Sequence, residues 1–423
     1  MKPIITTLPN GVRIVMVEQS NALTATALVL VGAGSATEEK ATSGISHVLE
    51  HMSFKGTPTL PNTKAIAETF ERLGAISNAF TSTEYTGYYA KGSPAHLDTF
   101  LEVLSDMYQN STFPESELSK EKGVIIEEIN MYEDMPQYKV TECLLKLMYA
   151  DQPAGWSIVG TKQTVSSFTR ADLVTYKDKH YHARNTVIAI TGAIDPKKVR
   201  AKVAALFKTL PDKKLSKPKK TVIKKATVPV VITHKPIDQA HIAIGFHGMS
   251  QDHPNRFVAS LIATILGRGL SARLTHVLRE ELGAAYYTHA SIDTYKDRGV
   301  FEITAGVDTK RINEILARIA QILKEIKTDL VSVDELQKAV EYTIGMQRLG
   351  LESSDEIAGF FGVQVLLRDK PNTPTILEKH YRAVTPADIR RVARTLFISD
   401  KAAISVLGPY KDRDIDPGPF RTL

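Results

Sequence analysis

The chain has 423 residues, 43% of them hydrophobic and 24% charged, so it can bury a large core and is too long for one ordinary domain. Its single cysteine, Cys143, excludes an internal disulfide bond and gives no sign of an oxidising compartment. The formal net charge of +6 is concentrated in residues 207–226, where Pro and Lys alternate without interleaved aromatic residues. We interpret this segment as a basic, solvated linker and expect no nucleic acid partner; a basic patch for an acidic partner is the alternative.

The N-terminal residues 1–18 run from Met1 directly into alternating apolar residues and an Asn-Gly turn. They lack the basic and apolar regions of a signal peptide and the arginines of a transit peptide. No uninterrupted apolar run approaches the roughly 18 residues expected of a membrane span. We therefore expect a cytoplasmic protein without a membrane segment.

The spacing of apolar residues predicts strands and helices in the first half of the chain. Apolar runs bounded by turn residues predict strands at 12–18, 22–32, 76–82 and 86–92. Apolar residues three and four positions apart predict helices at 43–54 and 63–74, with further helical patterns from 95 to 150.

The chain repeats itself on the two sides of the linker. Residues 169–192 and 385–408 align without a gap: each has a Thr-x-Ala-Asp helix start, an amphipathic helix and a buried strand that ends in Gly. Residues 113–129 resemble residues 331–347 in the same order along the chain. Each half is therefore expected to be one copy of the same unit.

Within each half, strands are grouped early and helices late. This order favours an antiparallel sheet covered by helices over a doubly wound parallel sheet. We predict an α+β fold with two homologous domains, an N-terminal one at residues 1–206 and a C-terminal one at residues 227–423, joined by the linker.

The stretch GISHVLEHMSFKGT, residues 44–57, places two histidines four residues apart with a glutamate directly before the second. Positions i and i+4 of a helix share a face, so His47 and His51 can direct ring nitrogens at one point about 2 Å from each. A zinc ion at that point would have Glu50 beside it, placed to take a proton from water. The alternative is a helix with two surface histidines.

A catalytic zinc usually has three protein ligands, and residues 119–136 offer the third. Glu121 and Glu128 are seven residues apart and share a helix face, whereas Glu127 is rotated by about 100° from Glu128. We choose Glu128 as the ligand, with Glu121 behind it as a supporting carboxylate. Periodicity alone does not separate Glu127 from Glu128.

These motifs resemble those of the inverted-motif zinc peptidases of the pitrilysin and insulinase type. The resemblance is closest to the short form, which includes the mitochondrial processing peptidase β subunit and its bacterial relatives. In this family 76 residues lie between the second histidine and the glutamate ligand, as they do between His51 and Glu128. The supporting glutamate of the family falls on Glu121, and the resemblance extends over the whole chain.

The resemblance implies one zinc ion per chain, held by His47, His51 and Glu128, with Glu50 as the general base. It also implies a zinc endopeptidase that cleaves unfolded peptides or presequence-like segments in an enclosed chamber. Zinc would polarise the substrate carbonyl and lower the pKa of its water towards roughly 7.

The second half has no metal motif, because residues 254–269 contain no histidine pair in the corresponding helix. It contributes Arg279 and Tyr286, which are seven positions apart. In the family an arginine and a tyrosine at this spacing contact the peptide around the scissile carbonyl, and the resemblance assigns that role to this pair. The alternative is a charge at a helix end and a half-buried strand residue.

A further substrate-binding element is expected at Asn78, Ala79 and Phe80. These residues would lie on an edge strand beside the metal helix, where an extended peptide can add as another strand. Main-chain pairing accepts many sequences, so the specificity would be loose. The alternative is an ordinary strand with Phe80 in the core.

Two other functions remain open from the sequence. One is a non-catalytic or partner-dependent subunit of a processing-peptidase-like complex, because the family includes inactive partners and respiratory-complex core subunits. Those typically have damaged metal motifs, whereas this motif is intact. The other is a metal-binding protein without peptidase activity.

The expected assembly is a homodimer. In the longer relatives four units form the chamber, with the metal in the first unit and the arginine and tyrosine in the fourth. This chain has two units, and it carries both sets of residues. We therefore expect each site to combine the metal residues of one subunit with Arg279 and Tyr286 of the other.

Overall fold

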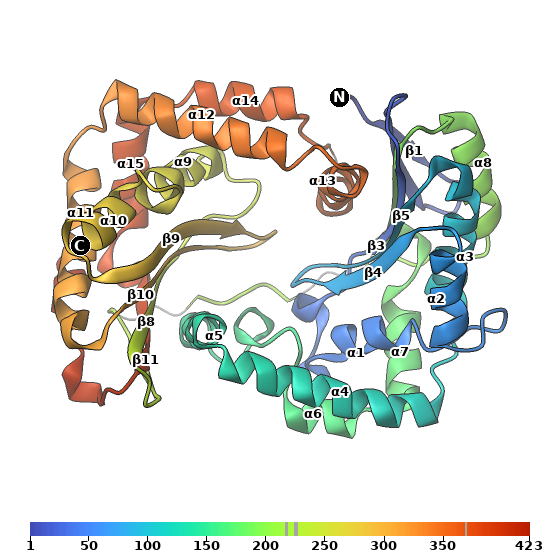
Figure 1. The fold of residues 1–423 in the computed structure, drawn as a ribbon, viewed down its shortest axis with the longest axis horizontal. Coiled ribbons are helices and arrows are strands. Elements are labelled where there is room, and N and C mark those ends of the chain that lie inside the picture. The colour runs from blue at the N-terminus through green and yellow to red at the C-terminus, as the bar shows by residue number, and fades with distance from the viewer. Residues whose placement is uncertain (216–218, 224–226, 369) are drawn as a thin grey trace. The chain divides into compact units, whose positions relative to one another are not determined.

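The computed structural model describes residues 1–215, 219–223, 227–368 and 370–423, and its elements are labelled in Figure 1. Residues 216–218 and 224–226 of the predicted linker lie outside the described residues. The strands of the first sheet are β1 (Ile4–Thr7), β2 (Arg13–Glu18), β3 (Ala25–Val31), β4 (Ile76–Thr81), β5 (Thr86–Gly92) and β6 (Thr186–Gly192). Those of the second are β7 (Val230–His234), β8 (Gln239–His247), β9 (Ala285–Thr294), β10 (Gly299–Asp308) and β11 (Ala402–Gly408).

The helices follow the predicted pattern, with most of them after the early strands of each half. In the first half they are α1 (Ile45–Met52), α2 (Thr63–Glu71), α3 (Leu97–Asn110), α4 (Glu115–Asp134), α5 (Pro136–Tyr149), α6 (Lys162–Ser167), α7 (Arg170–His180) and α8 (Pro196–Phe207). In the second half they are α9 (Arg256–Gly267), α10 (Arg273–Thr275), α11 (Ile312–Thr328), α12 (Val333–Leu349), α13 (Ser354–Leu367), α14 (Pro374–Arg382), α15 (Pro386–Leu396) and α16 (Gly418–Arg421).

The two sheets share one topology. The first has the strand order β1-β2-β6-β3-β5-β4 and the second β7-β11-β8-β10-β9, which repeats the first from β2 onward. All neighbouring strands pair antiparallel except β2 with β6 and β7 with β11. Each parallel pair arises because the chain returns to the sheet after a run of helices. The fold is therefore α+β with a duplicated, antiparallel-rich unit, as the order of elements predicts.

The centre of the first sheet is buried on both faces. All seven residues of β3 are buried, which explains their nearly continuous apolar sequence. Helices α3 and α13 contact β3, and Figure 1 shows them on opposite sides of this sheet. The apolar side chains of α13, such as Phe361 and Val365, pack against Val15, Leu28 and Leu30.

The compact units are not contiguous in the sequence. The first consists of Met1–Ile129, Ser157–Lys219 and Arg348–Pro374, and the second of the remaining residues. Helix α13 thus comes from the second half of the sequence and covers the first sheet. Helix α5 does the reverse, because its Val140 and Leu144 pack against the second sheet. Dividing the chain at residues 207–226 separates the strands of the two sheets. It does not assign α5 and α13 correctly, because each of these helices packs against the sheet formed by the other half of the sequence.

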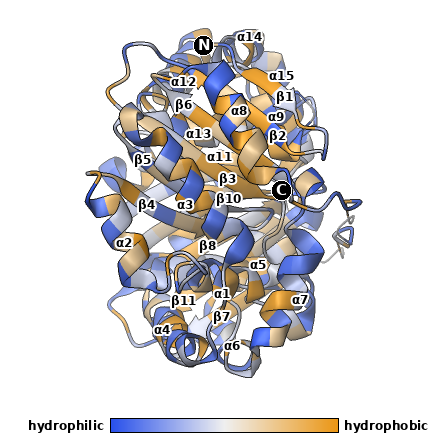
Figure 2. Cartoon of the chain, turned by 90° about the vertical axis from the view of Figure 1, so that its right-hand side faces the viewer, coloured by the Kyte–Doolittle hydropathy of each residue, from blue (hydrophilic) through white to orange (hydrophobic). Residues whose placement is uncertain are grey.

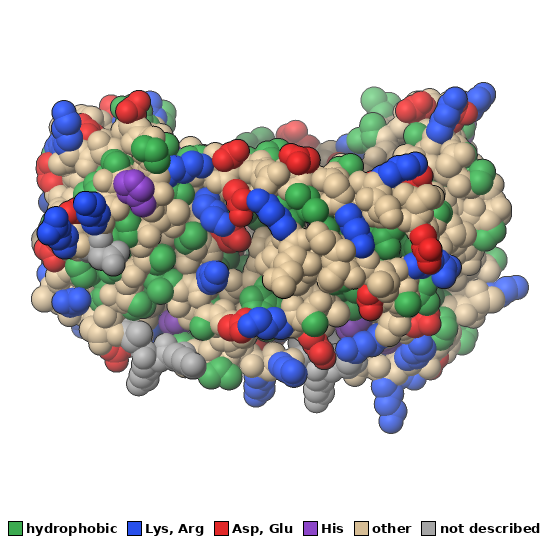
Figure 3. All heavy atoms as spheres, turned by 90° about the horizontal axis from the view of Figure 1, so that it is seen from below, with side chains coloured by type: hydrophobic (Ala, Val, Ile, Leu, Met, Phe, Trp, Pro, Cys, Tyr) green, Lys and Arg blue, Asp and Glu red, His purple; other side chains and the backbone are tan. Residues whose placement is uncertain are grey.

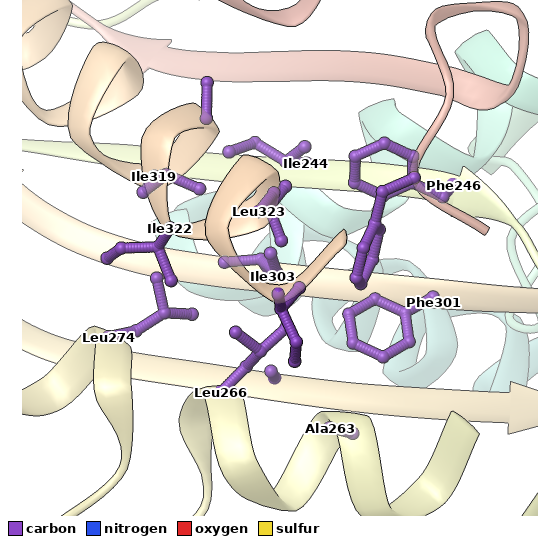
Figure 4. Close-up of a cluster of buried hydrophobic side chains, with 14 of the residues drawn as sticks. Ile244, Phe246, Ala263, Leu266, Leu274, Phe301, Ile303, Ile319, Ile322 and Leu323 are labelled. Atoms are coloured by element: carbon purple, nitrogen blue, oxygen red, sulfur yellow. The ribbon is translucent and has the colours of Figure 1, made fainter. Parts of the chain in front are cut away.

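The second unit has its own apolar core between β8, β10 and the helices α9 and α11. Figure 4 labels Phe246, Phe301, Ile303 and Leu323 within this core, where the two phenylalanines occupy paired positions of β8 and β10. All four of these side chains are almost completely buried. This core fixes the scaffold of a unit that lacks the histidine pair.

The surface is mixed in character. Helices such as α4 carry hydrophilic and hydrophobic residues in turn along their length (Figure 2). Basic and acidic side chains are interspersed on the face drawn in Figure 3. In the described part of the chain, no helix combines the length and the apolar character that crossing a membrane requires.

Candidate metal and catalytic site

Helix α1 begins at a residue that must be glycine. Gly44 has φ of 92°, in the left-handed region, and a Cβ there would lie 2.7 Å from the Cα of Gly160. A side chain at this position would therefore be strained and would clash with backbone. The tight entry sets where the helix starts, and so where His47, one turn later, points.

A buried carboxylate caps the start of α1. The Oε2 atom of Glu38 accepts a hydrogen bond from the Gly44 N–H at 2.7 Å, and its Oε1 atom accepts one from the Ser46 N–H at 3.0 Å. Burial raises the pKa of Glu38 to about 7, against the opposing effect of these two hydrogen bonds. The Ser46 hydroxyl also lies 2.8 Å from the Tyr176 hydroxyl. These contacts hold the first turn of the helix in place.

Three potential ligand atoms converge at the surface of α1. The Nε2 atoms of His47 and His51 are 3.3 Å apart, and Glu128 Oε2 lies 3.6 Å from the first and 3.5 Å from the second. Ligands about 2.0–2.1 Å from a tetrahedral zinc ion are separated from one another by about 3.3–3.4 Å. The three residues therefore fit a zinc ion, and they are the only such group of three among the described residues.

A supporting pair orients His51. Its Nδ1 atom lies 2.9 Å from Glu121 Oε1, and Glu121 Oε2 lies 2.5 Å from the Nζ atom of Lys55. With the Nδ1 proton donated to Glu121, the Nε2 lone pair of His51 points towards the other two ligand atoms. Glu121 is buried, and hydrogen bonds from His51 and Lys55 outweigh its desolvation and lower its pKa.

The two histidines have different electrostatic surroundings. Burial, and then the neighbouring His51, lowers the pKa of His47 to about 4, so His47 presents a neutral ring. Burial alone would lower the pKa of His51 too, but its contacts with Glu121 and Glu128 raise it to about 9. The acceptors that favour a proton on His51 also favour a divalent cation at the same point.

The structure separates the two candidate glutamates on α4. The Glu128 side chain, 23% exposed, reaches the histidines, whereas Glu127 is exposed to solvent. Glu121, two turns before Glu128 on the same face, reaches His51 from the other side. The arrangement therefore brings Glu128, and not Glu127, into the group of three that could hold a metal ion, while Glu121 contacts His51 at Nδ1. The roles of Glu128 as ligand and Glu121 as supporting residue stay predictions.

Glu50 lies beside the ligand cluster and is held by β4. Its Oε2 atom accepts a hydrogen bond of 2.5 Å from the hydroxyl of Thr81. Burial raises the pKa of Glu50, against the opposing effect of this hydrogen bond and of His51. A carboxylate whose pKa is raised in this way is suited to take up a proton and release it again.

The predicted substrate residues Asn78, Ala79 and Phe80 lie on β4, which is an edge strand of the first sheet. The N–H of Ala79 donates to Asn78 Oδ1 at 2.8 Å. The Phe80 ring packs over Gly87 and against Tyr85. The strand is thus available for main-chain pairing, while the Phe80 side chain belongs partly to the core.

Arg279 and Tyr286 belong to the second unit, whereas the ligand cluster belongs to the first. Arg279 lies in a turn of π-helix at His276–Glu281, and Tyr286 is the second residue of β9. The Tyr286 side chain is 70% exposed, and the Arg279 guanidinium lies 3.7 Å from Glu280. Both side chains are therefore accessible on the surface of their own unit.

Three residues of the site are absent from the sequence-based prediction. Glu38, Lys55 and Thr81 act on Gly44, Glu121 and Glu50 by hydrogen bonds. Glu38 lies six residues before Gly44, outside the positions where helix-capping residues are expected, so no local capping signal indicates it. The contacts of Lys55 and Thr81 depend on α4 and β4 coming to α1, which no local pattern indicates.

Known protein families match both halves of the chain. The insulinase (peptidase family M16) model matches residues 13–162, and the model of the peptidase M16 inactive domain matches residues 167–342. His47 and His51 lie in the first match. The second match covers much of the unit that lacks a histidine pair.

Relatives and solved structures agree with these matches. The chain is 35% identical over 405 residues to YmxG, an uncharacterized zinc protease of Bacillus subtilis, covering 95% of this chain and 97% of that protein. It is 31% identical over 417 residues to an uncharacterized zinc protease of Streptomyces coelicolor, covering 96% and 90%. A protease from Helicobacter pylori has the same fold, with a TM-score of 0.90 at 24% identity over 96% of this chain and 99% of that one. This chain is therefore a member of the insulinase (peptidase M16) family, in its short two-domain form.

Proposed function

We propose that this chain is a zinc endopeptidase that cleaves unfolded peptides. The observation that carries the proposal is the convergence of His47, His51 and Glu128 at zinc-ligand distances, with the carboxylate of Glu50 on the same helix. Relatives of similar length are named zinc proteases, which supports the choice of metal and reaction.

Each residue has a distinct part in the proposed reaction. Zinc, when bound, would polarise the scissile carbonyl and lower the pKa of water towards roughly 7. Glu50 accepts a proton from the attacking water and then passes it to the leaving amine. Glu121 and Lys55 keep the His51 ring in one orientation, and Glu38 keeps the helix start in place.

The outer edge of β4 is the proposed site for the substrate backbone. An extended peptide can pair with an edge strand through main-chain hydrogen bonds, which accept many sequences. At Ala79 a peptide carbonyl would replace Asn78 Oδ1 as the acceptor of the N–H. The peptide would then run alongside the strand that also contacts Glu50 through Thr81.

A mixed peptide library tests the proposed reaction. We expect internal cleavage of unstructured peptides, mapped by mass spectrometry, and loss of cleavage after removal of zinc with a chelator. Re-adding one equivalent of zinc should restore it. Tight zinc binding without cleavage of any peptide would instead favour a non-catalytic or partner-dependent subunit.

We further propose that the active enzyme is a homodimer that completes each site in trans in an enclosed chamber. Among the described residues, each chain has one potential ligand cluster, in its first unit, and the exposed Arg279 and Tyr286 pair in its second. The pair would contact the peptide around the scissile carbonyl in the site of the other subunit. A dedicated partner protein would make one of these two sets redundant.

Mixing two poorly active variants tests assembly in trans. In a dimer of a Glu50→Gln chain with a Tyr286→Phe chain, one site carries both lesions and the other site carries none. Random pairing of equal amounts therefore restores about a quarter of the unaltered activity.

The matched control mixes Glu50→Gln with Glu128→Gln chains, whose lesions both fall on the metal side. No intact site can form in that mixture, so its activity stays at the background level. If the first mixture also stays inactive after verified subunit exchange, each site is completed within one chain or by another protein.

A further inference from the structure

The Glu50 carboxylate is held at one oxygen only. Thr81 donates to Oε2 at 2.5 Å, and within the described residues Oε1 has neither a hydrogen bond nor an ion pair. When one carboxylate oxygen is held by a hydrogen bond, the direction of the other oxygen is restricted as well. The Thr81 hydroxyl therefore determines which way the free oxygen of the general base points.

The Thr81 hydroxyl is itself fixed by the sheet. Thr81 is the last residue of β4 and pairs with Thr86 at the hairpin end, where the Thr86 hydroxyl lies 3.5 Å away. Thr86 donates to the Ala33 carbonyl at 2.8 Å, which anchors the hairpin to the end of β3. Backbone pairing thus fixes the position of the residue whose hydroxyl contacts Glu50.

The hairpin turn next to Thr81 is anchored too. The N–H of Ala36 donates to the Thr83 carbonyl at 2.7 Å, and a Cβ at Gly34 would lie 2.2 Å from the Ser82 carbonyl oxygen. Only glycine allows this close approach of backbone to backbone. The position of Thr81 is therefore constrained from both sides of the strand end.

Side-chain alternation on β4 places Thr81 on the same face as Ser77 and Ala79, opposite to Phe80. Phe80 packs over Gly87, so its face belongs to the sheet core, and the Thr81 face is the one that meets α1. A peptide paired with β4 would stabilise the strand that carries this hydroxyl. One strand thus connects the proposed peptide site with the base.

We propose that Thr81 is a positioning residue that aligns Glu50 for proton transfer. The strand that is proposed to bind the peptide then also orients the carboxylate of the general base. This inference rests on the proposed peptidase function. Losing a hydrogen bond to a charged group in the transition state lowers the reaction rate by about ten- to hundredfold.

The test compares Thr81→Val with Thr81→Ser in the zinc-loaded enzyme. Valine keeps the shape and strand propensity but removes the hydroxyl, so kcat should fall by about tenfold or more while KM changes by less than about twofold. Serine keeps the hydroxyl and should restore most of kcat. In a Glu50→Gln background Thr81→Val should cause no further loss, because the aligned group is already removed.

Thr83→Val is the matched control. Thr83 lies two residues further along the chain, and its side chain has no hydrogen bond among the residues that the structure describes. Its replacement should leave kcat unchanged. Normal kcat in Thr81→Val, an equal loss in Thr81→Ser, or a full further loss in the Glu50→Gln background would each overturn the inference.

A measurement without turnover separates this inference from the proposed function. Crystal structures of the unaltered and Thr81→Val chains should show one orientation of the Glu50 carboxylate in the first and several in the second. A single, unchanged orientation in the variant would contradict the positioning role. Failure of the unaltered chain to cleave peptides would count against the peptidase proposal alone, since the crystal structures still test the contact.

Discussion

Replacing Glu50 with Gln should reduce peptide turnover by at least about 10²-fold while leaving zinc bound and the fold intact. Glutamine has nearly the same shape and can still accept the Thr81 hydrogen bond, but it cannot take up a proton. The three ligand residues are untouched, so metal analysis should still find one zinc ion per chain.

The variant should also remain stable and bind peptide. Burial raises the pKa of Glu50, which means that its charge is poorly solvated in the folded chain, so a neutral replacement should not lower the melting temperature. Peptide affinity can be measured by fluorescence anisotropy with a labelled, unstructured peptide. Near-normal cleavage by the Glu50→Gln chain would contradict the role of Glu50 as general base.

Replacing Glu128 with Gln should abolish zinc binding at stoichiometric metal and, with it, all activity. Glu128 Oε2 lies within 3.6 Å of both histidine Nε2 atoms, so its loss removes one of three protein ligands. Glu121→Gln should have a smaller effect, a loss of zinc affinity of about 10–100-fold, because Glu121 contacts His51 through Nδ1 and not the metal position.

Glu127→Gln is the matched control for both variants. It makes the same chemical change one residue away, at a side chain that is exposed to solvent. Zinc affinity, measured by competition with a chromophoric chelator, should follow the order Glu127→Gln, Glu121→Gln, Glu128→Gln, from tightest to weakest. If Glu127→Gln loses zinc and Glu128→Gln retains it, the assignment of the ligand is wrong.

Local patterns were sufficient for several parts of the fold. Strands β2 to β5 and helices α1 and α2 fall within the predicted ranges, because each has an apolar period of its own. The repeat predicts a second sheet of the same topology, which the strand orders confirm. The pattern does not indicate β1, since four residues are too few for a period to be recognised.

Long-range packing was not accessible in the same way. Helix α13 covers the first sheet and α5 the second, although each comes from the other half of the sequence. An amphipathic helix shows which of its faces is buried but not which sheet it is buried against. The contiguous division at the linker therefore describes the sequence repeat and not the packing of these helices.

At the site, the sequence alone determined what depends on one helix: the His47 and His51 pair and Glu50 share α1, and helical geometry fixes their spacing. It also limited the third ligand to one helix, where periodicity left Glu127 and Glu128 open. Only the tertiary structure shows which of these two carboxylates reaches the histidines, because the rotation of α4 about its axis is set by what it packs against. The same reason applies to Thr81 and Lys55: their partners are brought near by packing, and hydrogen bonds between separate elements leave no periodic trace in the sequence.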